Sequence, residues 1–438
     1  MKSSNPFWNF FSSVKLALFT LGCLSVTSII GTIIPQKESF QFYANKYGSK
    51  TATFFQLLDI TDMYTSWWFL ALLGLLTFNL IICSIDRWPN VWEQITRDNL
   101  ALPLERIKAM RTSASFSSSS SADQLTDTLQ PLLAGKGWKT SQKELDSGKL
   151  LFSQKTPWSR AGVYLVHLSI LIIFAGAIYG QLRGFRGSIM LPELQSSNVV
   201  YPYKNGEIIN LGFTIKCDRF DIEFYENTMP KEYKSKLTIL EQDRIVLQKD
   251  IEVNDPLKYK GITFYQASYQ PFNDFIFTLS SENNPPTILV GEFQKEVKWP
   301  ERNVSFGIIN IESIRDQASR LKIWFNDESG EPSQFWMKAG DRVEVKRGEN
   351  IYFLTAKQRY ATGLQVAKDP GVWLVYLGFC VLIVGLYMAF FMSHKRLWLI
   401  IEQEPDETHI YIKGSTNKNP SGFAAQFNEI ADTVEKHL

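Results

Sequence analysis

Four long apolar runs, separated by polar sequence, constrain this chain more than any other feature. The runs are Val14 to Ile34, Trp67 to Ile85, Gly162 to Gly180 and Gly371 to Met392. Each is close to the roughly 20 residues that a helix needs to cross the hydrocarbon core of a bilayer. The 438-residue chain is therefore predicted to be a multi-pass membrane protein whose four helices contact the lipid bilayer.

The first run shares a feature with secretory signal peptides, because it follows the basic residue Lys2. Its apolar stretch is nevertheless longer than that of most signal peptides. It ends in Ile34-Pro35-Gln36, without a cleavage site of small residues. We therefore predict a retained membrane anchor.

Lysine and arginine near the spans predict the orientation, because cytoplasmic loops are enriched in these residues. Four spans place both termini on one side. The near-span basic residues on that side are Lys15, Arg87, Arg160, Lys395 and Arg396. Those on the other side are Lys37, Arg183 and Lys368, with Lys46, Lys50 and Arg186 further away. The bias predicts cytoplasmic termini.

The spans divide the chain into eight segments, which alternate between the membrane and its two sides. They are the N-terminus with the first span (1–35), a short outer loop (36–66), the second span (67–86), a cytoplasmic segment (87–160), the third span (161–181), an outer domain (182–369), the fourth span (370–392) and a cytoplasmic tail (393–438).

The outer domain is predicted to be mainly β, because short β-branched or alternating runs recur between turn-forming residues. These runs are Phe213 to Cys217, Leu237 to Leu240, Ile262 to Gln266, Phe275 to Leu279 and Val304 to Ile311. In the cytoplasmic segment, the serine tract from Ser117 to Ser121 is typical of a flexible linker. The sequence of the tail predicts two strands, Trp398 to Ile401 and His409 to Ile412, and a final helix from Gly422 to Lys436.

Composition and motifs exclude several classes of function. A net charge of +2 is too balanced to predict a nucleic-acid partner. The four cysteines, Cys23, Cys83, Cys217 and Cys380, form no CxxC or CxxCH pattern, so neither a thiol pair nor covalent haem attachment is predicted. The chain also lacks a phosphate-binding loop, a nucleophile elbow and a cluster of metal-ligating side chains.

His167 is the candidate site residue, because it is an ionisable side chain deep in the third run. Such residues are costly in a membrane and are functional candidates. A neutral imidazole is a common haem ligand, but it also serves as a hydrogen-bonding contact between helices. The residue type alone leaves both readings open.

Helical periodicity places Gly162, Ser169, Gly176 and Gly180 on one narrow stripe of the third span, which is typical of close helix packing. His167 points nearly opposite, beside Ile170, Leu171 and Phe174. At 1.5 Å per residue it lies about 8 Å into the span, in the cytoplasmic half for the predicted orientation.

The other candidates are weaker. His394 follows the fourth span, beside Lys395 and Arg396, and is predicted to lie at the membrane interface. His409 and His437 are predicted to be solvated. The pair Trp67-Trp68 is compatible with a haem platform, but an interfacial aromatic belt is the favoured interpretation.

Six stretches of the chain share patterns with a known family. They are SVKLALFTLGCLSVTSIIGTIIPQ, DMYTSWWFLALLGLLTFNLIICSIDRWP, SRAGVYLVHLSILIIFAGAIYG, FDIEFYENTMPKEYKSKLTIL, IEVNDPLKYKGITFYQASY and TGLQVAKDPGVWLVYLGFCVLIVGLYMAFFMSHKRLW. They resemble the ResB family, the CcsB-type subunits of System II cytochrome c biogenesis. The resemblance runs from about residue 12 into the tail.

The resemblance implies a subunit that handles haem together with a CcsA-type (ResC) membrane partner and delivers it to apocytochrome c. It implies that His167 is an axial ligand of transiently bound haem b iron, and that the chain is a non-catalytic subunit of a haem lyase. It implies a bacterial cytoplasmic membrane, with the large domain outside. Thiol-reductant proteins are a further class of partner compatible with this role.

Two other functions remain open at this point. A haem b electron-transfer subunit usually supplies two histidines from facing spans, and only His167 lies inside a span here. A scaffold that anchors a partner through the outer domain would make His167 dispensable.

Overall fold

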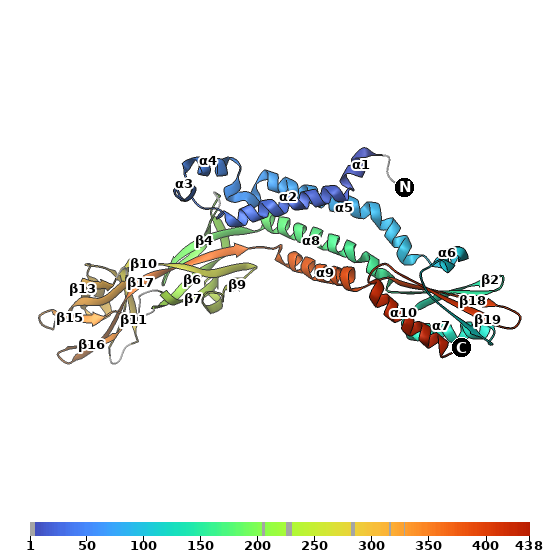
Figure 1. The fold of residues 1–438 in the computed structure, drawn as a ribbon. Helices are drawn as coiled ribbons and strands as arrows, with labels where there is room; N and C mark the ends of the chain where they lie inside the picture. The colour runs from blue at the N-terminus through green and yellow to red at the C-terminus, as the bar shows by residue number, and fades with distance from the viewer. Residues whose placement is uncertain (1–4, 204–205, 225–229, 282–284, 315–316, 328) are drawn as a thin grey trace. The chain divides into compact units, whose positions relative to one another are not determined.

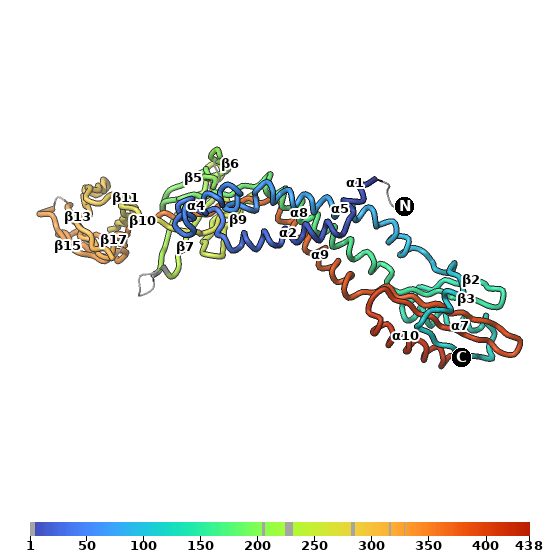
Figure 2. The backbone as a smooth tube through the Cα atoms, turned by 45° about the horizontal axis from the view of Figure 1, so that its top comes forward, coloured from blue at the N-terminus to red at the C-terminus, as the bar shows by residue number. Residues whose placement is uncertain are grey.

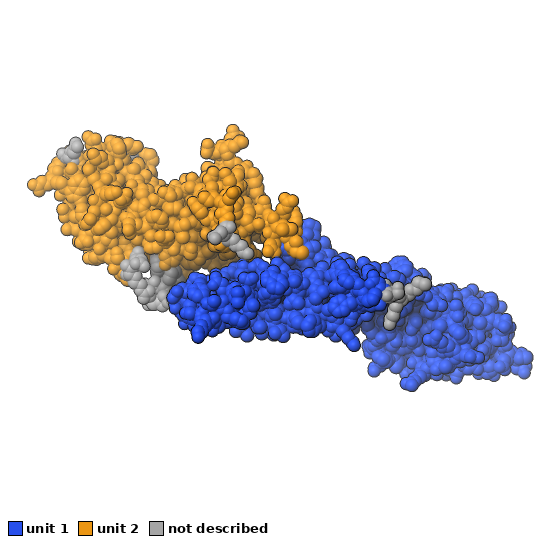
Figure 3. Space-filling model, turned by 90° about the horizontal axis from the view of Figure 1, so that it is seen from above, with its two compact units in different colours: residues 1–177, 373–438 blue, residues 178–372 orange. Residues whose placement is uncertain are grey.

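The computed structural model describes the whole chain except residues 1–4, 204–205, 225–229, 282–284, 315–316 and 328. It divides into two compact units (Figure 1 and Figure 3). One unit comprises residues 1–177 and 373–438, and the other comprises residues 178–372. The first contains the long apolar helices and a small sheet, and the second is built from strands. The predicted fold class is confirmed.

All four apolar runs form helices that are long and apolar enough to cross a membrane. They are α2 (Val14–Ile33), α5 (Trp67–Thr96), α8 (Gly162–Arg183) with the preceding turn η3 (Pro157–Ala161), and α9 (Val372–Phe391). Helix α5 differs from expectation, because it continues past the end of its apolar run to Thr96. Pro89 does not stop it, and the buried Ile95 anchors the extension.

The helices pack through two kinds of contact. An apolar cluster of Leu24, Met63, Phe69, Leu76 and Leu80 joins α2 to α5, with Ile170 and Leu171 of α8 packed against it. Between α8 and α9 the backbones approach closely. A Cβ on Gly385 would lie 2.8 Å from the backbone nitrogen of Val166, and a Cβ on Gly162 would lie 2.6 Å from that of Ala389. The predicted small-residue stripe is therefore the packing face of α8.

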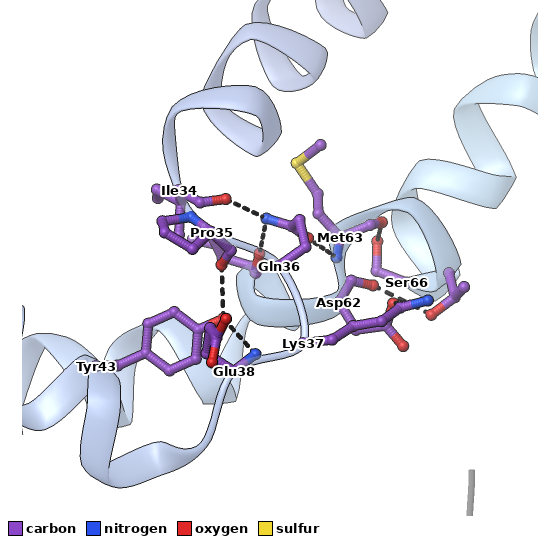
Figure 4. Close-up of polar contacts among 11 residues, drawn as sticks. Ile34, Pro35, Gln36, Lys37, Glu38, Tyr43, Asp62, Met63 and Ser66 are labelled. Atoms are coloured by element: carbon purple, nitrogen blue, oxygen red, sulfur yellow. Dashed lines mark hydrogen bonds and ion pairs between the residues drawn. The ribbon is translucent and has the colours of Figure 1, made fainter. Parts of the chain in front are cut away.

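Residues 36–66 form α3 (Phe40–Tyr47), α4 (Ser49–Leu57) and the turn η1 (Ile60–Thr65). Gln36 ties the end of α2 to η1 (Figure 4). Its Nε2 donates to the carbonyls of Ile34 at 2.9 Å and Ile60 at 3.1 Å, and its Oε1 accepts from the Met63 amide at 3.0 Å. The Tyr43 hydroxyl donates to the Pro35 carbonyl at 2.6 Å.

A small α+β domain joins two segments that are far apart in sequence (Figure 2). Its sheet has the order β1-β19-β18-β3-β2. The strands are β1 (Thr112–Ser118), β2 (Lys139–Leu145), β3 (Gly148–Lys155), β18 (Lys395–Gln403) and β19 (Thr408–Thr416). Helices α7 (Ala122–Gly135) and α10 (Pro420–Glu435) pack on one face. On the other face Trp398 packs with Phe152 and Ile107 of α6 (Leu104–Lys108). The tail elements are confirmed as predicted.

The serine tract is not a flexible linker, so that prediction is wrong. Ser117 and Ser118 end β1, where they pair with His409 and Thr408 of β19. Ser121 caps α7, and Gln124 completes a capping box. Serine is common at helix caps and in turns as well as in linkers, so the composition alone was misleading.

His394, which was predicted at the membrane interface beside the end of the fourth span, is buried inside the protein instead of being exposed there. Its side chain is fully buried. The His394 Nδ1 accepts from Arg160 Nε at 2.9 Å, and its Nε2 lies 3.0 Å from Gln154 Oε1. Because Nδ1 accepts, the proton resides on Nε2 and the ring is neutral. This contact joins the start of the third span to the small domain.

The neutral state of His394 predicts an acid-sensitive fold. Burial, with Arg160 and Arg396 nearby, lowers the pKa of His394 to about 3, whereas the unfolded value is about 6.5. Between these values the unfolded chain binds one more proton. The free energy of unfolding therefore falls as the pH drops below 6.5, by about 1.4 kcal/mol per pH unit from this residue.

Thermal unfolding of the purified full-length protein at pH 7.5 and 5.5 measures this term. The wild type should lose about 1.4 kcal/mol more stability across this interval than His394→Asn does. The exposed His437 provides the control, because His437→Asn should retain the wild-type pH dependence. An identical pH dependence in wild type and His394→Asn would contradict the assignment.

The second unit is built on a ten-stranded antiparallel sheet and a four-stranded sheet. The first sheet contains β4 (Phe185–Pro192), β5 (Ser196–Pro202), β6 (Ile209–Phe224), β7 (Pro230–Glu241), β8 (Arg244–Ile251), β9 (Leu257–Tyr259), β10 (Ile262–Ser281), β11 (Thr287–Glu292), β16 (Arg342–Arg347) and β17 (Asn350–Lys368). The second contains β12 (Val297–Trp299), β13 (Val304–Ile314), β14 (Gln317–Asn326) and β15 (Ser333–Lys338). All five predicted runs lie in strands.

The long strands β10 and β17 run through two separate apolar cores. Phe264 and Val366 belong to one core, and Phe277 and Leu354 belong to the other. Their register shifts between Pro271 and Phe275, where the strands pass from one core to the next. The unit is thus two β lobes that share a pair of strands.

Candidate functional site

His167 lies on α8, and among the described residues it is the histidine within a candidate span. Its ring is half-buried. The His167 Nδ1 lies 2.9 Å from the Ser84 hydroxyl oxygen on α5. No other hydrogen bond to this ring occurs within the part of the chain that the structure describes. The Nε2 atom is therefore free of protein partners in that part.

The Ser84 contact determines what the imidazole can do. A serine oxygen can accept a proton from Nδ1–H, while its own hydroxyl donates elsewhere. In that tautomer the lone pair of His167 is on Nε2, the free atom. Histidines that ligate metals usually donate their other ring N–H to such an acceptor. The arrangement fits a single metal ligand and also fits a helix–helix hydrogen bond.

A row of aromatic rings leads away from His167. Ser84, Trp88 and Trp92 are spaced four residues apart, so they share one face of α5. Opposite them lie His167, Tyr164 and Trp158. Ring centroids are 6.1 Å apart for Tyr164–His167, 5.2 Å for Trp88–Tyr164, 5.9 Å for Trp88–Trp92 and 5.7 Å for Trp92–Trp158. We call Trp88, Trp92, Trp158 and Tyr164 the aromatic row.

This row was not predicted from the sequence. The aromatic pair that the sequence singled out, Trp67-Trp68, begins α5. Ser84 lies 17 residues further along the helix, a distance of about 26 Å at 1.5 Å per residue, so that pair is remote from His167. The four-residue spacing from Ser84 to Trp92 was the available signal, but it extends beyond the apolar run, where a helix was not expected.

The prediction that Ile170, Leu171 and Phe174 surround His167 is only partly correct. Ile170 and Leu171 pack against the α2–α5 cluster, so they do not line an open space beside the ring. Val163 and Leu168 are 47% and 49% exposed. His167 therefore lies at the edge of the helix packing, with apolar surface next to it. A flat apolar ligand held there would need a second surface to enclose it.

The remaining histidines and the cysteines do not add to this site. Both ring nitrogens of His394 are hydrogen-bonded, one to Arg160 and the other to Gln154. His409 is half-buried, and its Nε2 lies 3.8 Å from Glu404 Oε2. His437 is exposed. Burial raises the pKa of Cys217 to about 12, so this thiol is not reactive. No cluster of three metal-ligating side chains occurs among the described residues.

Comparison with known proteins gives consistent matches along the chain. The model of the ResB-like family matches residues 14–320 and 312–428. The chain is 30% identical to "Cytochrome c biogenesis protein CcsB" of Prochlorococcus marinus, over 98% of this chain and 99% of that protein. It is 28% identical to the protein of the same name from Microcystis aeruginosa, over 100% and 97%. It is 26% identical to "Cytochrome c biogenesis protein Ccs1" of Porphyra purpurea, over 97% and 95%.

Proposed function

Because the chain belongs to the ResB-like family of cytochrome c biogenesis proteins, we propose that it holds haem b transiently in the membrane through His167. In this proposal a CcsA-type membrane partner supplies the opposing ligand, and the haem is passed on for attachment to apocytochrome c. The chain itself is a subunit of the haem lyase rather than the complete enzyme. The observation that carries the proposal is the imidazole of His167, with a free Nε2 and a bonded Nδ1.

Each part of the site has a distinct role in this proposal. His167 would hold the haem iron through Nε2, and iron ligation by imidazole is common in haem proteins. Ser84 accepts the Nδ1 proton, which fixes the tautomer and the ring orientation. The half-buried position of His167 and the exposed Val163 and Leu168 leave room for a partner to enclose the porphyrin.

A haem spectrum of the purified protein tests this function. With the CcsA-type partner co-expressed, the complex should carry haem with two axial ligands, and the chain alone should retain far less. Stoichiometric, redox-cycling haem in the chain alone would favour an electron-transfer subunit. A complex that supports cytochrome c assembly but carries no haem at His167 would favour a scaffold.

We also propose that both termini and residues 87–160 are cytoplasmic, and that residues 182–369 lie outside a bacterial cytoplasmic membrane. The small domain supports this topology. Its sheet combines β1–β3, which precede the third span, with β18 and β19, which follow the fourth. Those two segments must therefore lie on one side of the membrane. The bias of basic residues near the spans favours the cytoplasm as that side.

Reporter fusions test the topology, and the structure offers exposed positions between strands for them. Alkaline phosphatase, which is active only outside the cytoplasm, should be active at Gly340, in the turn between β15 and β16. It should be inactive at Asp406, between β18 and β19. The opposite pattern would reverse the orientation but leave the shared side of the two segments intact.

A further inference from the structure

The aromatic row lies on the part of α5 that continues past its apolar run. That run ends at Ile85, and Asp86 and Arg87 are exposed. Trp88 and Trp92 come one and two turns after Ser84, on the stretch that leads to Thr96. The row therefore runs from a membrane-embedded imidazole to the polar end of the helix pair.

Exposure increases along the row with distance from His167. Tyr164 and Trp88 are half-buried, whereas Trp92 is 45% exposed and Trp158 is 53% exposed. Successive ring centroids are never more than 6.1 Å apart. A flat apolar molecule could thus remain in contact with aromatic surface over the whole path to His167.

A cation accompanies the row. Arg87 immediately precedes Trp88 and lies three residues after Ser84, so it is on the side of α5 that carries Ser84 and the row. It makes no ion pair within the described residues. Arg160, by contrast, is already bonded to Gln94 at Oε1 and to His394 at Nδ1. Arg87 is therefore the cation that remains available for a carboxylate on a bound ligand.

Membrane-interface aromatics offer an alternative explanation for exposed tryptophans. Trp67, at the opposite end of α5, fits that explanation, because it is 75% exposed and makes no ring contact among the described residues. The row differs in two respects. Its rings contact one another between α5 and the segment from Trp158 to Tyr164. The row also ends at His167, near Arg87, whose guanidinium makes no ion pair among the described residues.

We propose that the aromatic row and Arg87 form a loading site for haem on the side of the membrane that holds the termini. The exposed rings of Trp92 and Trp158 take the porphyrin face, and Arg87 pairs with a propionate. From there haem passes along Trp88 and Tyr164 to the Nε2 of His167. This inference rests on the proposed function, and it adds the surface from which His167 is supplied.

Stopped-flow spectroscopy of the full-length protein, in complex with its CcsA-type partner in lipid nanodiscs, tests the loading site. Haemin is mixed with haem-depleted complex, and the uptake rate is followed separately from the final haem content. The double variant Trp92→Ala/Trp158→Ala should take up haem about tenfold more slowly, because two stacking surfaces are lost. Its final haem content at saturating haemin should remain that of the wild type, because His167 is unchanged.

Matched variants separate this role from a general effect on the membrane interface. Trp67→Ala removes an indole that is even more exposed than those of Trp92 and Trp158, and it should leave the uptake rate unchanged. Trp92→Phe/Trp158→Phe keeps two aromatic faces and should restore most of the rate. If the alanine double variant slows uptake no more than Trp67→Ala does, the loading site is wrong.

The propionate contact has its own probe. Arg87→Gln should slow the uptake of haemin severalfold, but it should not slow the uptake of haemin dimethyl ester, which lacks free carboxylates. Equal slowing of both compounds, or of neither, would rule out a propionate contact at Arg87. A different measurement tests the proposed function itself. If His167→Ala kept the wild-type haem content, that function would be wrong whatever the uptake rates are.

Discussion

Replacing Gly385 by leucine is expected to separate α8 from α9 and to destabilise the membrane helices. A Cβ at this position would lie 2.8 Å from the Val166 nitrogen and 3.1 Å from the Leu165 carbonyl carbon. Backbone atoms cannot move aside as a flexible side chain can, so the helices must shift. Overpacking of this kind costs about 1–3 kcal/mol, and the added bulk of leucine places the effect at the upper end.

Gly74 of α5 provides a matched control, because no atom lies within 4 Å of a Cβ built there. In detergent, Gly385→Leu should unfold at a temperature several degrees below that of Gly74→Leu. Its Val166 contact is adjacent to His167, so haem content should fall as well. Equal melting temperatures for the two variants would show that α8 and α9 do not pack as described.

Replacing His167 by alanine is expected to remove haem from the complex and to abolish holocytochrome c formation. Loss of residues that merely orient a metal ligand costs about 10–100-fold in metal affinity, so loss of the ligand itself should exceed about 100-fold. Membrane insertion should be normal, because removing a polar group from a span lowers the cost of insertion. Ser84 can then donate to a carbonyl in its own helix.

Three comparisons make this result specific. His437→Ala, at an exposed position, should retain wild-type haem. Ser84→Ala should weaken haem binding by about 10–100-fold, and Ser84→Thr, which keeps the hydroxyl, should not. Added imidazole should restore part of the haem in His167→Ala by filling the vacated coordination position. Wild-type haem and cytochrome c in His167→Ala would favour the scaffold function.

The spans and the α8 packing face were predictable because their signals are local. Apolar length alone identifies a span, and the recurrence of Gly162, Ser169 and Gly176 at helical spacing identifies a packing face. The β character of residues 182–369 was predictable for the same reason. Each strand carries its own alternating or β-branched pattern.

The small domain was not predictable as one domain, because its strand pairing is non-local. Leu399 of β18 pairs with Leu151 of β3 across the outer domain and two spans, and no property of either strand specifies that partner. The burial of His394 follows from the same pairing. Its neighbours Lys395 and Arg396 suggested an exposed interface, whereas Gln154 and Arg160 bury it.

At the candidate site, the sequence indicated His167 but not its surroundings. Helical periodicity correctly predicted that the imidazole points away from α9. It could not show that Ser84 of another helix meets Nδ1, because the register between two helices depends on their packing. The aromatic row was missed for a related reason. The apolar run ends at Ile85, whereas tertiary contacts such as the burial of Ile95 accompany the continuation of the helix.

Haem ligation by His167 is tested most directly by exchanging the ligand atom. The full complex with His167→Cys should be purified and its ferric and ferrous spectra compared with those of the wild type. A thiolate in place of an imidazole changes the ligand field of the iron, so the spectrum should change to that of a histidine–thiolate or five-coordinate haem. An unchanged two-histidine spectrum at full haem content would show that His167 does not ligate the iron.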